Sequence, residues 1–253
     1  MKIFETHAHL DFPEFDPDRE QVIRKSLNAG VEFIINIGID EATSRASIKL
    51  ADTYPQIYAA VAYHPHEAKH YNPELIRSLS LHPQVVAIGE TGLDYYRNHS
   101  PREVQKQVFR DQAGLASELG LPLIIHDRDA HADCLQILDE YQPAKVVFHC
   151  FSGDVGFASQ IIERNWFISI TGNITYRNQM LEDVVRYLPL NRLFIETDCP
   201  FLTPCPFRGK RNSPEYLPYT ISRISELKGI TPRQVAEATF DNAFQFFLGE
   251  RIK

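Results

Sequence analysis

The sequence predicts an α/β fold of the (β/α)8 TIM-barrel class, formed by a single domain over residues 1–253. Two observations lead to this class. Short apolar runs recur along the chain with amphipathic stretches between them, which is the pattern of alternating strands and helices. The length suits one large α/β domain, and no low-complexity linker interrupts the alternation.

Eight short runs rich in Val, Ile or Phe are the expected strands. They occupy residues 2–7, 31–37, 57–62, 85–90, 122–126, 145–149, 167–171 and 193–197. Their continuous apolar character is typical of strands that are buried on both faces, as in a parallel sheet covered by helices. Eight such strands in alternation with helices predict a barrel.

The stretches between these runs predict helices. Residues 101–119 and 154–165 are amphipathic, and the segment 214–248 reads as two further helices that are separated near residues 229–232. A doubly wound open sheet is the rival fold. No glycine-rich phosphate loop follows the first strand, which weakens that rival.

Composition excludes some classes of protein. A net charge of −7 argues against a general nucleic-acid coat, although it allows a polyanionic substrate at one locally positive site. No run of about 18 apolar residues is present, so we expect no membrane span. The first residues lack the apolar core of a signal peptide, and the 4 cysteines form no CxxC pair. We therefore expect a reduced, cytoplasmic protein.

Side chains of the types that bind metals stand at the carboxyl ends of five of the expected strands. They are His7 and His9 at the end of the first, Glu90 at the end of the fourth, His126 at the end of the fifth, His149 at the end of the sixth and Asp198 at the end of the eighth. In a barrel of parallel strands these carboxyl ends converge on one face, where barrel enzymes place their active sites. We therefore expect these side chains to meet in one pocket.

Each of these signals has a structural alternative when it is taken alone. His7 and His9 point to one side of a strand, yet an HxH pair is more often incidental than a metal site. A single His126 or His149 also suits a hydrogen-bonded core histidine, and either carboxylate alone is compatible with a buried salt bridge. Their coincidence at five strand ends favours a metal site over all of these alternatives.

Four imidazoles and two carboxylates suit two divalent metal ions, for which Zn, Mg, Mn, Fe and Ni are the candidates. We expect one ion at His7, His9 and Asp198 and the other at His126 and His149, with Glu90 as the bridge between them.

Asp198 and Glu90 are the predicted catalytic residues. A two-metal site lowers the pKa of bound water towards about 7, and Asp198 is a candidate for taking the proton from the attacking water. Glu5 and Glu196 share the inward phase of the ligands but lie deeper. We interpret them as partners that orient the ligands, with simple interior hydrogen bonding as the alternative.

Longer motifs surround these residues. They are ETHAHLDF at 5–12, YHPHEA at 63–68, IGETGLDYYR at 88–97, LIIHDRDA at 123–130, FHCFSG at 148–153, SITGNITYRN at 169–178, FIETDCPFLTP at 194–204, GKRNSP at 209–214 and VAEATFDNAFQFF at 235–247. Together they resemble the TatD family of metal-dependent deoxyribonucleases, within the amidohydrolase-like barrels. The resemblance covers essentially the whole chain, in order.

This resemblance implies the same six metal ligands and the hydrolysis of phosphodiester bonds in DNA, in some members as a 3′→5′ exonuclease. Other relatives remove D-amino acids from tRNA, and many have no assigned substrate. Three positions depart from the family pattern: Tyr63 replaces a usual glycine, Cys199 a usual alanine or serine, and Ser213 a usual glutamate. None of them removes a ligand, so they bear on the fit of the substrate.

The predicted substrate contacts are His64, His66, Arg97, Lys210 and Arg211. The last two belong to a basic loop after the eighth strand, and phosphate sites in barrels commonly use such late loops. Cations beside aromatic residues suit a single strand of nucleic acid. A merely solvated basic loop is the alternative, which the position beside the last expected ligand disfavours.

The predicted function is a two-metal-dependent hydrolase that cleaves phosphodiester bonds in single-stranded DNA, with RNA as a further substrate. The alternative is a metal-dependent deacylase or an amide or ester hydrolase, such as a D-aminoacyl-tRNA deacylase, because a metal polarises a carbonyl equally well. A non-catalytic, metal-bound nucleic-acid interaction module is the third hypothesis. We expect nucleic acid (DNA, RNA or tRNA) as the partner, and we infer no membrane and no obligate protein partner.

Overall fold

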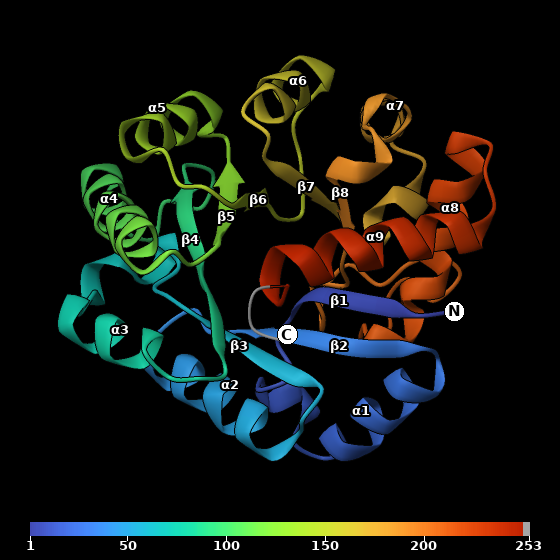
Figure 1. Ribbon diagram of the computed structural model, residues 1–253, viewed down its shortest axis with the longest axis horizontal. Helices are drawn as coiled ribbons and strands as arrows, with labels where there is room; N and C mark the ends of the chain where they lie inside the picture. Colours follow the sequence, from blue (N-terminus) through green and yellow to red (C-terminus); the bar gives the residue numbers. More distant parts are fainter. Residues whose placement is uncertain (250–253) are drawn as a thin grey trace. The chain divides into compact units, whose positions relative to one another are not determined.

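The computed structural model describes residues 1–249 and has an α/β fold (Figure 1). The strands are β1 (Ile3–Ala8), β2 (Val31–Ile37), β3 (Ile57–Val61), β4 (Val85–Asp94), β5 (Leu123–Arg128), β6 (Val146–Phe148), β7 (Phe167–Ile170) and β8 (Leu193–Ile195). The helices are α1 (Arg19–Asn28), α2 (Glu41–Thr53), α3 (Pro73–Ser80), α4 (Arg102–Leu119), α5 (His131–Tyr141), α6 (Val155–Glu163), α7 (Gln179–Tyr187), α8 (Leu217–Lys228) and α9 (Pro232–Phe247).

The order of the elements is that of a (β/α)8 fold. The sheet has eight strands in the order β1 to β8, and at least one helix follows each of them along the chain. The neighbours β3 to β6 pair in parallel, as do β7 and β8. The predicted fold class is therefore confirmed.

The chain divides into two compact units. The first consists of Met1–Ile35 with Cys150–Lys253, and the second consists of Asn36–His149. The first unit holds β1, β7, β8 and helices α1 and α6 to α9, whereas the second holds β3 to β6 and α2 to α5. The single-domain organisation stays a prediction.

In the first unit, α9 packs against β1 and β8 through aromatic side chains (Figure 1). Phe194 of β8 is fully buried, with its ring centroid 5.1 Å from that of Phe246 and 6.0 Å from that of Phe247. Phe4 of β1 stacks on Phe247 at 6.1 Å. This apolar contact stabilises the two strands whose ends carry His7, His9 and Asp198.

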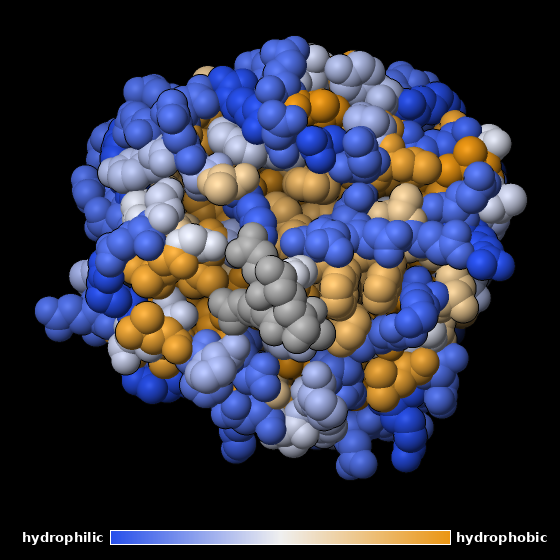
Figure 2. Space-filling model, in the orientation of Figure 1, coloured by the Kyte–Doolittle hydropathy of each residue, from blue (hydrophilic) through white to orange (hydrophobic). Residues whose placement is uncertain are grey.

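The opposite face of α9 is hydrophilic. Its exposed side chains recur with the helical period and include Arg233, Gln234, Glu237, Asp241 and Gln245. Figure 2 shows this row of hydrophilic residues along the helix. Helix α9 is therefore amphipathic and buries one side only.

In the second unit, α2 packs on β3 and α4 packs on β4. Strand β4 is buried along its whole length, and its later part, Thr91 to Asp94, pairs with Ile125 to Arg128 of β5. Gly92 is required for this close approach, because a Cβ built on it would lie 2.1 Å from the carbonyl oxygen of His126, and its φ is +136°.

The observed boundaries differ from the expected ones at functional strand ends. β4 continues four residues beyond the expected end at residue 90, because residues 91–94 pair with β5. β8 ends at Ile195, two residues earlier than expected. The segment 214–248 forms α8 and α9, and Gly229 ends α8 in the left-handed conformation.

Among residues 1–249 no helix combines the length and the apolar character needed to cross a lipid bilayer.

Candidate metal centre

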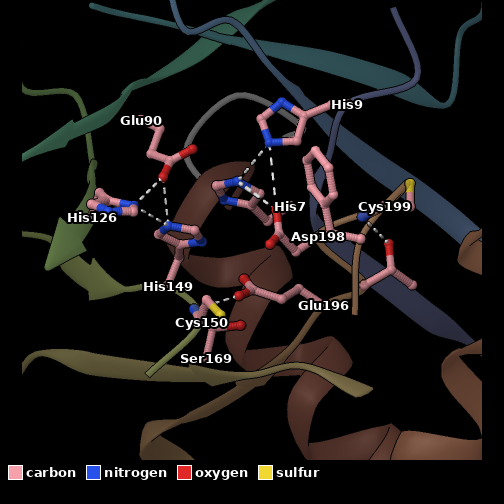
Figure 3. A network of polar contacts seen from close by, with 12 residues as sticks. His7, His9, Glu90, His126, His149, Cys150, Ser169, Glu196, Asp198 and Cys199 are labelled. Carbon is pink, nitrogen blue, oxygen red and sulfur yellow. Dashed lines mark hydrogen bonds and ion pairs between the residues drawn. The ribbon is translucent and has the colours of Figure 1, made fainter. Parts of the chain in front are cut away.

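His7, His9 and Asp198, here called the β1–β8 cluster, lie together in the first unit. The Nε2 atoms of His7 and His9 are 3.3 Å apart. Oδ1 of Asp198 lies 3.8 Å from Nε2 of His7 and 3.5 Å from Nε2 of His9 (Figure 3). Both histidines are buried, whereas the Asp198 side chain is 15% exposed. The carboxylate is therefore the member of this cluster that solvent reaches.

The backbone fixes this geometry. The N–H of Asp198 donates to the carbonyl of His7, and the N–H of His9 donates to the carbonyl of Cys199. Asp198 has a φ of +55°, a left-handed conformation that Asp tolerates better than most side chains. The end of β1 and the segment after β8 therefore hold the three ligand candidates in a fixed relation.

Glu5 and Glu196 accept hydrogen bonds from segments that carry or adjoin the ligand candidates. Glu5 accepts hydrogen bonds from the backbone N–H of His7 and from the N–H and hydroxyl of Thr197. Burial raises the pKa of Glu5 to about 8, against the lowering effect of these hydrogen bonds. Glu196 accepts from the N–H of Cys150 at 2.6 Å (Figure 3). Both lie where they can orient the segments that carry the ligands.

Glu90, His64, His126 and His149, here called the Glu90 cluster, lie together in the second unit. Oε1 of Glu90 lies 2.6 Å from Nδ1 of His126, 2.7 Å from Nε2 of His149 and 3.3 Å from Nε2 of His64. Figure 3 shows Glu90 facing His126 and His149. Burial alone would raise the pKa of Glu90, but these imidazoles hold it well below its ordinary value. The cluster thus holds a buried carboxylate anion.

Asp94 extends this cluster and is not among the residues predicted from the sequence. Its Oδ2 lies 3.2 Å from Nε2 of His126 and 2.9 Å from Nε2 of His66. Its Oδ1 accepts from the N–H of Arg97. The available signal was its spacing: Asp94 lies four residues after Glu90 on one strand and therefore shares its phase.

The donor atoms of both clusters fit divalent metal ions. Two groups of three residues bring their candidate ligand atoms within 4.8 Å of one another inside each group. They are His7, His9 and Asp198 in one group, and His64, Glu90 and His126 in the other. Each cluster directs imidazole nitrogens towards a shared carboxylate oxygen, and two ring nitrogens 3.3 Å apart need a proton or a cation between them. Nitrogen and oxygen ligands of this kind suit zinc and the other borderline ions.

The predicted substrate contacts have different surroundings. His64 is buried against Glu90, and His66 contacts Asp94. Arg97 and Lys210 are exposed.

Arg211, by contrast, is engaged within the protein. Its guanidinium forms an ion pair with Asp18 at 2.7 Å, donates to the carbonyl of Glu14 and lies 4.6 Å from the ring centroid of Phe15. The ion pair lowers the pKa of Asp18. Arg211 therefore anchors the loop after β8 to the segment after β1.

Asn212 shapes this same loop and is fully buried. Its Nδ2 donates to the carbonyls of Thr197 and Phe201, and its Oδ1 accepts from the N–H of Ser213. The side chain thus connects three points of the chain: Thr197, which precedes Asp198, Phe201, and Ser213 beside Asn212 itself.

We expect Asn212→Ala to lower the free energy of unfolding by about 2–4 kcal/mol, because it leaves several backbone groups without a partner. Urea denaturation measures this change. Asn191→Ala, at an exposed position, is the matched control and is expected to stay within about 0.5 kcal/mol of the wild type. Equal stability of the two variants would contradict this role of Asn212.

Known proteins are similar to this chain in sequence and in fold. Residues 4–248 match the family model described as TatD related DNase. The chain is 43% identical over 251 residues to "Uncharacterized metal-dependent hydrolase YabD" of Bacillus subtilis (strain 168), covering 97% of this chain and 98% of that protein. It is 34% identical over 256 residues to "3'-5' ssDNA/RNA exonuclease TatD" of Salmonella typhimurium, covering 97% and 98%.

A solved structure agrees with the sequence comparison. The crystal structure of YJJV, a TatD homologue from Escherichia coli K12, superposes with a TM-score of 0.91 at 31% sequence identity, covering 97% of each chain. The matched family model spans both clusters of imidazoles and carboxylates described above. The chain therefore belongs to the family of TatD-related DNases and is a metal-dependent hydrolase.

Proposed function

We propose that this hydrolase cleaves phosphodiester bonds in single-stranded DNA from the 3′ end, and that it uses two divalent metal ions. The observation that carries the proposal is the presence of two groups of imidazoles around a carboxylate: His7 and His9 with Asp198, and His64 and His126 with Glu90. The name of the Salmonella relative, a 3′-5′ ssDNA/RNA exonuclease, supports the choice of substrate. RNA is a further substrate under this proposal.

One ion would be held by the β1–β8 cluster and the other by the Glu90 cluster. In the second cluster His126 and His149 are the histidine ligands that we propose, because both rings lie within 2.7 Å of Oε1 of Glu90. The bridging role of Glu90 stays a prediction. When bound, divalent ions polarise a phosphoryl oxygen and lower the pKa of water.

The protein's own groups would move the proton. Within the β1–β8 cluster the side chain of Asp198 is the most exposed, at 15%, and its carboxylate accepts a proton from the attacking water. His7 and His9 hold the carboxylate in place from one side. Glu5 accepts hydrogen bonds from the N–H groups of His7 and Thr197 and so fixes the backbone at His7 and at the residue before Asp198. These contacts thus hold the carboxylate of Asp198, the proposed base, in one position.

Local cations support a phosphate-bearing substrate in a protein whose net charge is −7. Lys210 is exposed on the loop after β8, and Arg97 is exposed after β4. Lys210 lies with its ammonium 5.5 Å from the ring centroid of Phe207. Cations next to aromatic rings are typical of sites that bind single-stranded nucleic acid.

A nuclease assay tests this function. Metal-free protein is reconstituted with Zn²⁺, Mn²⁺ or Mg²⁺ and incubated with single-stranded DNA that carries a 5′ label. We expect a ladder that shortens one nucleotide at a time from the 3′ end, and no release without metal. D-aminoacyl-tRNA and simple amides serve as parallel substrates. Turnover of either, with intact DNA, would replace the nuclease proposal by that of a deacylase or an amide hydrolase.

A further inference from the structure

Tyr96, Arg97 and Arg128, here called the arginine–tyrosine cluster, form an exposed group in the second unit. Tyr96 is 60% exposed. The guanidinium carbon of Arg128 lies 4.0 Å from its ring centroid, and that of Arg97 lies 5.6 Å from it. One aromatic ring thus gathers two guanidinium groups at the surface.

These two arginines lack the carboxylate partners that others have. Among residues 1–249, neither Arg97 nor Arg128 forms an ion pair, whereas Arg77, Arg110 and Arg223 pair with glutamates. Two like charges close together repel each other, and an anion between them would remove this cost. A guanidinium presents a planar fork of N–H donors that matches a phosphate.

The cluster is also fixed next to the Glu90 cluster. In the sheet register Arg128 is the partner of Asp94, whose Oδ2 contacts His126. The N–H of Arg97 donates to Oδ1 of Asp94 at 2.7 Å. The N–H of Tyr95 donates to the carbonyl of Arg128 at 2.9 Å. Both arginines are therefore held by the backbone that also carries the ligand candidates.

Tyr95, the residue before Tyr96, has the contacts of a tyrosine with a structural role. Its hydroxyl donates to Asp133 at 2.6 Å, and Arg102 covers its ring at 4.3 Å. This ring is half-buried and is bound to a carboxylate network that also includes Lys106. Among residues 1–249 the Tyr96 hydroxyl forms no hydrogen bond of this kind, so holding the loop in place does not explain its exposed ring.

We propose that the arginine–tyrosine cluster binds a backbone phosphate of the substrate strand that is not the phosphate being cleaved. Arg97 and Arg128 hold this phosphate, and Tyr96 orients the two guanidinium groups through its ring. The proposal rests on the proposed function, because it assigns a second phosphate of a nucleic-acid strand. It adds Arg128 and Tyr96 to the substrate contacts and predicts that substrates with only one phosphate lose this contact.

Equilibrium binding tests the cluster without turnover. Metal-free protein is titrated into a fluorescein-labelled single-stranded DNA of ten nucleotides, followed by anisotropy. We expect Arg128→Gln to weaken binding about 10-fold and to reduce the slope of log K against log salt by about 1. Arg24→Gln, on the exposed face of α1, removes the same charge elsewhere and is the matched control. Equal affinity of the two variants would overturn the proposal, as would a wild type that does not bind the strand.

Two substitutions of Tyr96 test the role of its ring. Tyr96→Phe keeps the aromatic face and should bind like the wild type, whereas Tyr96→Leu should weaken binding about 3–10-fold, by the energy of a cation–π contact. Because the ring is exposed, neither variant should change the thermal midpoint by more than a few degrees. A Tyr96→Leu protein that binds normally would remove Tyr96 from the cluster.

Kinetics with the reconstituted enzyme separate this proposal from the proposed function. The ratio of KM for a dinucleotide, which has one phosphate, to KM for the ten-nucleotide strand should be about 10-fold smaller in Arg128→Gln than in the wild type. An equal loss on both substrates would place Arg128 at the scissile phosphate and overturn the proposal. Strand binding that depends on Arg128, in a protein that cleaves no DNA, would retain the cluster and reject the nuclease function.

Discussion

Replacement of Asp198 by asparagine is expected to lower kcat about a thousandfold on single-stranded DNA without unfolding the protein. The loss follows because the amide cannot accept a proton from water and is a weaker metal ligand. The fold should survive for two reasons: the side chain is 15% exposed, and asparagine tolerates the φ of +55° at this position.

The measurement combines steady-state kinetics with circular dichroism of the same sample. Asp241→Asn, on the exposed face of α9, is the control for loss of one carboxylate charge. A folded Asp198→Asn protein with kcat near that of the wild type would remove Asp198 from the role of base.

Replacement of Glu90 by glutamine is expected to remove the ion of the Glu90 cluster, so that metal content falls from about two ions per chain to about one, and to lower kcat/KM by at least about a hundredfold. The pKa of Glu90 lies well below its ordinary value, so this group is an anion among His64, His126 and His149. A neutral amide removes that charge and presents an N–H₂ group to ring nitrogens that face a carboxylate oxygen in the wild type.

Elemental analysis of Glu90→Gln alongside its activity measures this effect. Glu74→Gln, at an exposed position at the start of α3, is the control. Full metal content together with normal turnover would show that the carboxylate of Glu90 is dispensable. Full metal content with low turnover would restrict its role to the chemical step.

The fold was predictable because its signal is repeated. Eight apolar runs with amphipathic stretches between them define the order of strands and helices. Each additional repeat reduces the number of folds that are compatible with this pattern. The boundaries were less predictable. The pairing of residues 91–94 with β5 lengthens β4 beyond its apolar run, and this depends on Gly92, whose role is visible only once the neighbouring strand is placed.

Part of the site was predictable for a similar reason. His7, His9 and Asp198 stand at strand ends, and the structure places them together. Asp94 was missed because it follows a strand end that the apolar pattern set too early. The pairing of Arg211 with Asp18 was not predictable, because it depends on how two loops 193 residues apart meet. Charge type alone does not tell an anchored arginine from one that is available to a substrate.

The metal content of the active protein decides whether hydrolysis depends on two bound divalent ions. Protein is purified without chelators, its bound metals are measured by inductively coupled plasma mass spectrometry, and its hydrolysis of single-stranded DNA is followed before chelation, after chelation and after metal is restored. We expect about two divalent ions per chain, loss of hydrolysis with their removal, and recovery when they are returned. Full hydrolysis by protein that holds less than about a tenth of an ion per chain would rule out a metal-dependent reaction.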